Sequence, residues 1–173
     1  MRSDTDIAMF KPILAAGLAL ASAAATADSR TSTSDPALID HGRYVTMIAG
    51  CNDCHTPGFA PSGGKIPEAL WLTGDRVGFA GPWGTTYPSN LRLKVGAMDL
   101  ATWKTYARAL TARPPMPYWA VNAMSDRDLE ALWAYVRSLG PAGEPAPAAL
   151  PPGVEPAGPV VRFPAPPASI AQH

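Results

Sequence analysis

Excess charge of either sign is missing from this chain. Its 173 residues include 14 lysines and arginines and 14 aspartates and glutamates, so the formal net charge is zero. Binding to nucleic acid, or to a membrane through a polybasic patch, would favour an excess of basic residues. We therefore expect no nucleic-acid partner. The length is sufficient for one domain and short for two.

Long hydrophobic runs are also scarce. The N-terminal run, residues 12–25, is alanine-rich and shorter than the about 20 residues that a membrane-spanning helix needs. Basic residues precede it, and Ala25-Thr26-Ala27 fits the small-x-small rule for signal-peptide cleavage. We expect residues 1–27 to be a secretory signal peptide and residues 28–34 a flexible lead-in. An uncleaved membrane anchor, and a true start at Met9, are the alternatives.

Cysteine occurs only twice, and both copies lie in one motif, Cys51-Asn52-Asp53-Cys54-His55. The spacing C-x-x-C-H is that of a c-type haem attachment site. The two thiols can form thioether bonds to the haem vinyl groups, and His55 can then ligate the iron from one face. The motif predicts one covalent haem c, which leaves no cysteine for a disulfide.

Two other uses of the cysteine pair stay open. A zinc site would need Cys51, Cys54, His55 and His41, and two consecutive residues would then have to share one metal. A redox dithiol should open a helix after a strand, inside a βαβ pattern. A helical pattern precedes Cys51 instead, which favours haem attachment.

The apolar spacing predicts three main helices. The first starts at Asp35-Pro36, as N-cap and first helical position, and runs to Cys51. The second covers residues 99–110. The third begins at Ser125 with a variant of the capping box and ends at Gly140-Pro141. We expect residues 35–139 to form the domain.

Glycine and proline dominate two other segments. Residues 56–86 should be irregular, because these residue types interrupt long regular elements. Residues 140–173 contain ten prolines and should form neither helix nor sheet. They are expected to be either a disordered tail or an extended strap along the domain.

Together these features resemble class I c-type cytochromes. The resemblance covers roughly residues 38–162. Within this class, the chain is similar to bacterial periplasmic cytochromes associated with dehydrogenases and terminal oxidases. It is carried by His41-Gly42-Arg43-Tyr44-Val45, Cys51 to Pro57, Thr86-Tyr87-Pro88-Ser89-Asn90-Leu91 and Pro115-Met116-Pro117-Tyr118-Trp119. It implies a small all-α cytochrome c fold, with three main helices around one haem and a Pro-rich C-terminal strap.

The resemblance also gives roles to single residues. Gly42 would be the point where the last helix, around Leu132 and Tyr135, crosses the first. Related sequences often carry an acidic, glycine-containing turn after the Asn-Leu pair, whereas this chain has Arg92-Leu93-Lys94-Val95-Gly96 there. The geometry beside the haem propionates is therefore expected to differ.

A methionine sulfur is the implied sixth ligand of the iron. Met116 is the first candidate, because its proline-fixed loop would lose little entropy in holding a weak thioether ligand. Met124 is the second candidate. The third possibility is no methionine, with His41 or water in its place.

Four further residues are candidates for contacts with the haem propionates or pocket. Their side chains combine apolar bulk or small size with hydrogen-bonding groups. They are Trp83, Tyr87, Ser89 and Asn90.

The function implied is electron transfer in the periplasm rather than enzymatic catalysis, because a His/Met iron has no open position for a substrate. A dehydrogenase would be the electron donor, and another cytochrome or an oxidase the acceptor. One alternative is a haem-based sensor with a labile sixth position. Another is an electron-transfer subunit of a larger dehydrogenase complex.

Overall fold

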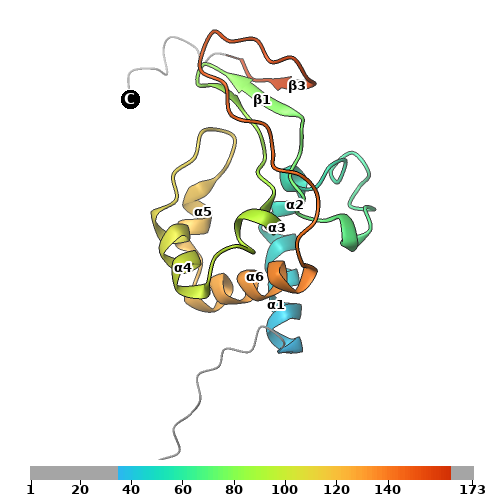
Figure 1. The fold of residues 1–173 in the computed structure, drawn as a ribbon, viewed down its shortest axis with the longest axis vertical. Coiled ribbons are helices and arrows are strands. Elements are labelled where there is room, and N and C mark those ends of the chain that lie inside the picture. The colour runs from blue at the N-terminus through green and yellow to red at the C-terminus, as the bar shows by residue number, and fades with distance from the viewer. Residues whose placement is uncertain (1–34, 165–173) are drawn as a thin grey trace, which may run out of the picture. The chain divides into compact units, whose positions relative to one another are not determined.

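A computed structural model describes residues 35–164. The expected signal peptide, the lead-in at 28–34 and the end of the tail, 165–173, lie outside the described residues. Within them the chain forms six α-helices, one short 3-10 helix and a three-stranded sheet (Figure 1). The prediction of an all-α fold is therefore wrong, because a sheet and further short helices accompany the three main helices. The two segments rich in glycine and proline supply the strands.

The three predicted helices are present. They are α1 (Pro36–Ile48), α4 (Leu100–Ala109) and α6 (Asp126–Leu139). The Asp35 carboxylate accepts a hydrogen bond from the Ala37 amide at 3.0 Å and so caps α1. Ser125 and Asp128 form a complete capping box on α6. These local signals place the helices because they satisfy amide groups that a helix start leaves unpaired.

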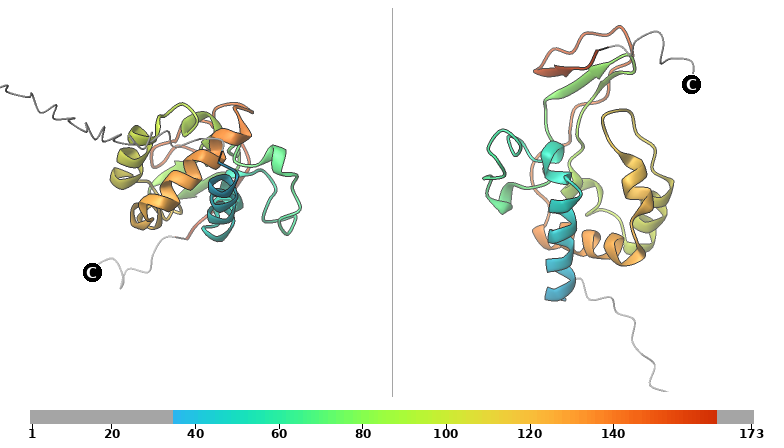
Figure 2. Two further views of the ribbon diagram at one scale, coloured as in Figure 1. Left: turned by 90° about the horizontal axis from the view of Figure 1, so that it is seen from below. Right: turned by 180° about the vertical axis from the view of Figure 1, so that it is seen from behind.

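Helices α1 and α6 cross at Gly42 (Figure 2). A Cβ atom on Gly42 would lie 2.0 Å from the carbonyl oxygen of Ala131 and 2.6 Å from Cβ of Tyr135. Only a residue without a side chain permits this approach. The predicted role of Gly42 as the crossing point is confirmed.

Four smaller helical elements accompany the three main helices. They are α2 (Cys51–His55), η1 (Glu68–Leu70), α3 (Leu91–Lys94) and α5 (Tyr118–Ala123). The longest of them has six residues, too few for a periodic apolar pattern to show. The Asn90 side chain caps α3 by accepting a hydrogen bond from the Leu93 amide at 3.1 Å.

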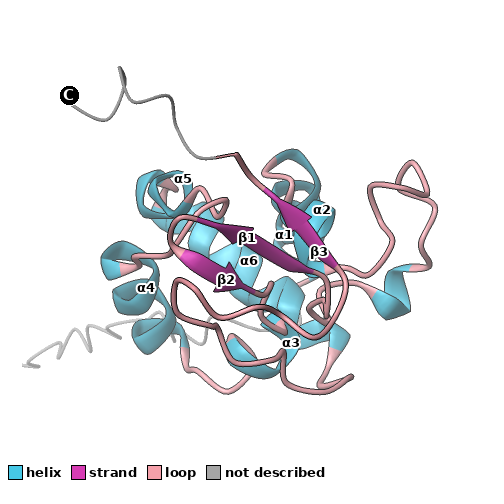
Figure 3. Cartoon of the chain, turned by 90° about the horizontal axis from the view of Figure 1, so that it is seen from above, coloured by secondary structure: helices cyan, strands magenta, loops and turns pink. Residues whose placement is uncertain are grey.

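The sheet joins parts of the chain that are distant in sequence. Strands β1 (Gly78–Gly81) and β2 (Gly84–Thr86) form an antiparallel hairpin. Strand β3 (Val160–Arg162) pairs with β1 in parallel, in the order β2-β1-β3 (Figure 3). The register pairs Phe79 with Thr86 on one side and with Val161 on the other.

Residues 140–164 form an extended strap, which runs from the end of α6 to the sheet (Figure 1). The prediction that this segment forms no sheet is wrong, because residues 160–162 lack proline and keep the amide groups that a strand needs. Thr85 and Leu150 exchange backbone hydrogen bonds at 3.1 and 2.9 Å. The strap is thus attached at its middle and at β3.

The core lies where α6 meets α1 and α4. Leu129, Leu132 and Tyr135 of α6 are buried there, together with Trp103 of α4. The Trp103 ring nitrogen donates to the Leu129 carbonyl at 2.7 Å, which satisfies its polar group inside the core. None of the helices within residues 35–164 has the length and apolar character needed to traverse a membrane.

Candidate haem-binding site

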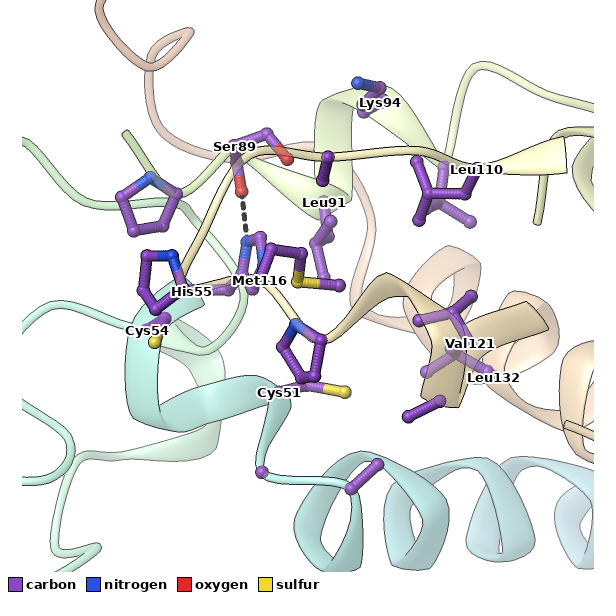
Figure 4. A pocket seen from close by; sticks show the side chains of 18 of the residues that line it. Cys51, Cys54, His55, Ser89, Leu91, Lys94, Leu110, Met116, Val121 and Leu132 are labelled. Atoms are coloured by element: carbon purple, nitrogen blue, oxygen red, sulfur yellow. Dashed lines mark hydrogen bonds between the residues drawn. The ribbon is translucent and has the colours of Figure 1, made fainter. Parts of the chain in front are cut away.

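The C-x-x-C-H motif forms helix α2, which follows α1 after a two-residue turn. Since α1 is held by α6 at Gly42, the motif is fixed on the main helix pair of the fold. The two thiols and the His55 ring lie at the edge of a cavity of about 300 Å³ (Figure 4). We call this the haem cavity.

The haem cavity is mostly apolar and is built by segments from the whole domain. Its lining includes Cys51, Cys54 and His55 of α2, Phe79 of β1, Tyr87, Ser89, Leu91 and Lys94, Trp103 and Tyr106 of α4, Met116, Val121, Met124, and Leu132 of α6. Paired thiols, a buried imidazole and a methionine around an apolar space fit a covalently attached haem.

His55 is buried and has a defined orientation. Its Nδ1 lies 2.7 Å from the backbone carbonyl oxygen of Ser89 (Figure 4). A carbonyl can only accept, so Nδ1 carries the proton and Nε2 keeps its lone pair for a metal. Burial lowers the pKa of His55, although the Ser89 carbonyl opposes this shift. The neutral ring is the form that ligates iron.

The cysteine thiols do not have the character of a reactive redox pair. Burial raises the pKa of Cys51 to about 11 and also raises the pKa of Cys54. Catalytic dithiols have lowered pKa values instead. Both cysteines are free thiols in this structure. The raised pKa values of the two thiols do not favour the redox-dithiol alternative.

The four residues proposed as zinc ligands do not come together either. No group of three or more His, Cys, Asp or Glu side chains that could hold a metal ion occurs within the described part of the chain. His41 points to α6 instead, where its Nε2 lies 2.8 Å from the Asp128 carboxylate. His41 is also not part of the cavity lining.

Both candidate methionines line the haem cavity. Met116 lies between Pro115 and Pro117, and its sulfur projects into the space beside His55 and Cys51 (Figure 4). Met124 lies at the other end of α5, immediately before the capping residue of α6. The choice of Met116 as sixth ligand stays a prediction.

The four candidate pocket residues have different positions. Tyr87 and Ser89 line the haem cavity, whereas Trp83 and Asn90 do not. Trp83 packs on Phe163 of the strap, with the ring centres 5.6 Å apart. Asn90 is buried among backbone groups and donates to the carbonyls of Ala142 and Glu144. Their assignment as haem contacts stays a prediction.

Sequence reasoning missed the two basic residues of the segment that replaces the acidic turn. Lys94 lines the cavity, with its Nζ 5.2 Å from the ring centre of Tyr106. Arg92 is buried and binds three carbonyls, those of Ala69, Leu139 and Gly140. It thereby satisfies carbonyl groups at the end of α6. The unusual Arg-Leu-Lys sequence was the available signal.

Comparison with known proteins gives several cytochrome subunits of dehydrogenases among the relatives. The chain is 30% identical over 138 residues to the gluconate 2-dehydrogenase cytochrome c subunit of Pantoea cypripedii. The aligned region covers 73% of this chain and 28% of that protein. It is 29% identical over 133 residues to the cytochrome c subunit of the quinone alcohol dehydrogenase of Komagataeibacter europaeus, which covers 70% and 26%. These similarities confirm the resemblance to c-type cytochromes.

Among c-type cytochromes, the similarity is to subunits of dehydrogenases. The fructose dehydrogenase cytochrome subunit of Gluconobacter japonicus is also similar, with 28% identity over 120 residues, 63% of this chain and 23% of that protein. The chain thus spans about a quarter of the length of these relatives. No protein-family model and no solved structure matches it.

Proposed function

We propose that this protein is an exported single-electron carrier that holds one haem c. Cys51 and Cys54 would form the thioether bonds, and His55 and Met116 would be the axial ligands. The observation that supports this most directly is the haem cavity itself, which gathers the two thiols, the free Nε2 of His55 and the Met116 sulfur in one apolar space.

The residues of the chain hold and shield the group. When bound, the haem supplies an iron that cycles between the ferrous and ferric states. The Ser89 carbonyl orients the His55 ring, and Met116, which lines the same cavity, would supply the second ligand. The apolar lining would keep water away from the haem, and methionine ligation would raise its reduction potential. A raised potential suits a protein that receives electrons from a dehydrogenase.

The partner we propose is a dehydrogenase, with another cytochrome or an oxidase as acceptor. The names of the relatives support the donor, since they are cytochrome subunits of gluconate, alcohol and fructose dehydrogenases. This chain would be the electron-transfer component and not the catalytic one. Export to the periplasm would follow from the N-terminal signal pattern.

Carbon monoxide binding tests this function against a haem-based sensor. The holoprotein is produced with haem-attachment machinery, reduced, and mixed with carbon monoxide. A closed His/Met site should resist displacement, and its spectrum should change little. Met116→Ala serves as the control that opens the site and binds the gas at once. Rapid binding to the unaltered protein would favour the sensor and contradict the proposal.

A further inference from the structure

The group that orients His55 is a main-chain carbonyl, so its position depends on what holds residues 88–90. On one side the Asp75 amide donates to the Pro88 carbonyl at 3.1 Å. The Gly74 amide donates to the carbonyl of His55 itself at 2.8 Å. A Cβ atom on Gly74 would lie 2.7 Å from the Asn90 nitrogen, so this backbone packs directly on the segment.

Asn90 holds the other side. It is 3% exposed, and its Oδ1 accepts from the Leu93 amide at 3.1 Å. Its Nδ2 donates to the strap carbonyls of Ala142 at 2.8 Å and Glu144 at 3.2 Å. Both protons of the amide are therefore used by the strap. A buried amide that lost these acceptors would be destabilised, so Asn90 and the strap position each other.

Gly143 lies between the two acceptor residues, in close contact with the Asn90 amide. Its φ is +73°, and a Cβ atom added there would lie 3.2 Å from Asn90 Nδ2 and 3.2 Å from the Thr73 side chain. A side chain at position 143 would therefore press on the Asn90 amide. The carbonyl that binds His55 belongs to the preceding residue, Ser89.

We propose that Asn90 is a positioning residue, which couples the C-terminal strap to the iron ligand His55 through the Ser89 carbonyl. This inference rests on the proposed function, because it concerns the tuning of a bound haem. A close carbonyl acceptor on Nδ1–H makes the imidazole a stronger electron donor and so favours ferric iron. Loosening the strap from Asn90 should weaken that bond and raise the reduction potential.

Asn90→Ser is the direct test, measured on the holoprotein. Serine keeps an oxygen that can cap α3, but it lacks the two amide protons that reach the strap. We expect an upward shift of the haem midpoint potential, with both axial ligands retained. The NMR signal of the His55 Nδ1–H proton should also move upfield in the ferrous protein, because its hydrogen bond is weaker.

Gly143→Ala and Gly153→Ala form a matched pair that separates coupling from general damage. Both glycines lie in the strap with positive φ, +73° and +83°, so alanine strains the backbone at both positions. A Cβ atom meets Asn90 at position 143 and nothing within 4 Å at position 153. The potential should rise in Gly143→Ala and stay at the unaltered value in Gly153→Ala. If Asn90→Ser does not fold, this pair decides.

The results distinguish this inference from the proposed function. An unaltered protein without covalent haem would defeat the proposed function. Covalent haem with an unchanged potential and an unchanged His55 signal in Asn90→Ser, or in Gly143→Ala if that variant is needed, would overturn only the coupling. Equal shifts in Gly143→Ala and Gly153→Ala would overturn it too.

Discussion

The haem cavity has a histidine wall, lined by residues 49–51, 54–55 and 87–89, and a methionine wall, lined by residues within 110–124. At the histidine wall, partly buried hydrogen bonds join segments that are 34 to 54 residues apart, from His55 to Ser89 and from the adjacent Asn90 to the strap. On the methionine wall, the Asn122 amide binds the carbonyls of Ala107 and Leu110, only 15 and 12 residues away.

Because of this difference, we expect changes to the two walls to affect two different functions, covalent attachment of the haem and binding of the sixth iron ligand. The histidine wall is fixed by contacts across the fold, so a change there should affect haem attachment or the stability of the domain. The methionine wall depends on prolines on both sides of Met116 and, apart from an exposed bond from Arg113 to the Leu150 carbonyl, on short-range hydrogen bonds. A change there should alter the sixth ligand and leave the domain folded.

The largest expected effect breaks the histidine wall at the attachment point. The double variant Cys51→Ser, Cys54→Ser removes both sulfur atoms that can bond the haem vinyl groups. We expect complete loss of covalent haem, measured by haem staining of a denaturing gel. Persistent staining in the double variant would contradict the assigned attachment site.

Met116→Ala tests the methionine wall. Haem staining should remain, and the absorption band between methionine sulfur and ferric iron should disappear, because the sulfur is lost and attachment is not. Met124→Ala is the matched control, since Met124 lines the same cavity. Loss of the band in Met124→Ala, with retention in Met116→Ala, would move the ligand to Met124.

Gly42→Ala tests how strongly the histidine wall depends on the α1–α6 crossing. Helix propensity alone would favour alanine by about 1 kcal/mol. The 2.0 Å approach to the Ala131 carbonyl should reverse that sign and lower the free energy of unfolding by about 3 kcal/mol. Denaturant titration of the holoprotein measures this. Gly158→Ala, where the nearest atom is 3.9 Å away, should change little, and equal losses in both variants would contradict the account.

Two arginines that bind backbone carbonyls, Arg92 shortly after the histidine wall in sequence and Arg108 beside the methionine wall, extend the comparison. Arg92 is 7% exposed and binds the end of α6, whereas the Arg108 side chain is 41% exposed and binds Asn122 and Met124. Arg92→Met should lower the unfolding free energy by about 3 kcal/mol, because buried carbonyls lose their donor. Arg108→Met should lower it by about 1 kcal/mol. The reverse order in denaturant titrations would contradict the comparison.

The smallest effect is a pH dependence at the contact between α1 and α6. The Ser125 hydroxyl, and then His41, lower the pKa of Asp128 by hydrogen bonding. A lowered folded-state pKa gives stability that is present above the unfolded pKa, about 4, and is lost as the pH falls through the folded value. Asp128→Asn should remove this loss of stability at low pH, which amounts to no more than about 1 kcal/mol of unfolding free energy. Thermal midpoints at pH 7 and pH 3 measure it, and an unchanged pH dependence would exclude Asp128 as its source.

The sequence predicted those features that depend on neighbouring residues. Asp35-Pro36 and the Ser125–Asp128 pair mark helix starts by local hydrogen bonding, and C-x-x-C-H is complete within five residues. Gly42 was also predictable, because the resemblance assigned it the helix crossing.

The features that depend on distant contacts could not be predicted. Strand β3 has three residues among prolines, and its partner Gly78 lies 82 positions before Val160. The Ser89 carbonyl that holds His55 belongs to the backbone, which every residue has, so the residue type at position 89 does not predict this contact. Asn90 was expected to contact the haem pocket because a side-chain amide can bind a haem propionate as well as a backbone carbonyl. Its two strap acceptors are backbone carbonyls from 52 and 54 residues away.

The visible and near-infrared spectrum of the purified holoprotein tests the central claim most directly. The account predicts one covalent haem c, low-spin in both oxidation states, with the band of methionine bound to ferric iron. A protein with no covalent haem, or with a ferric spectrum of histidine and water ligation, would contradict the assignment of His55 and Met116 as the axial pair.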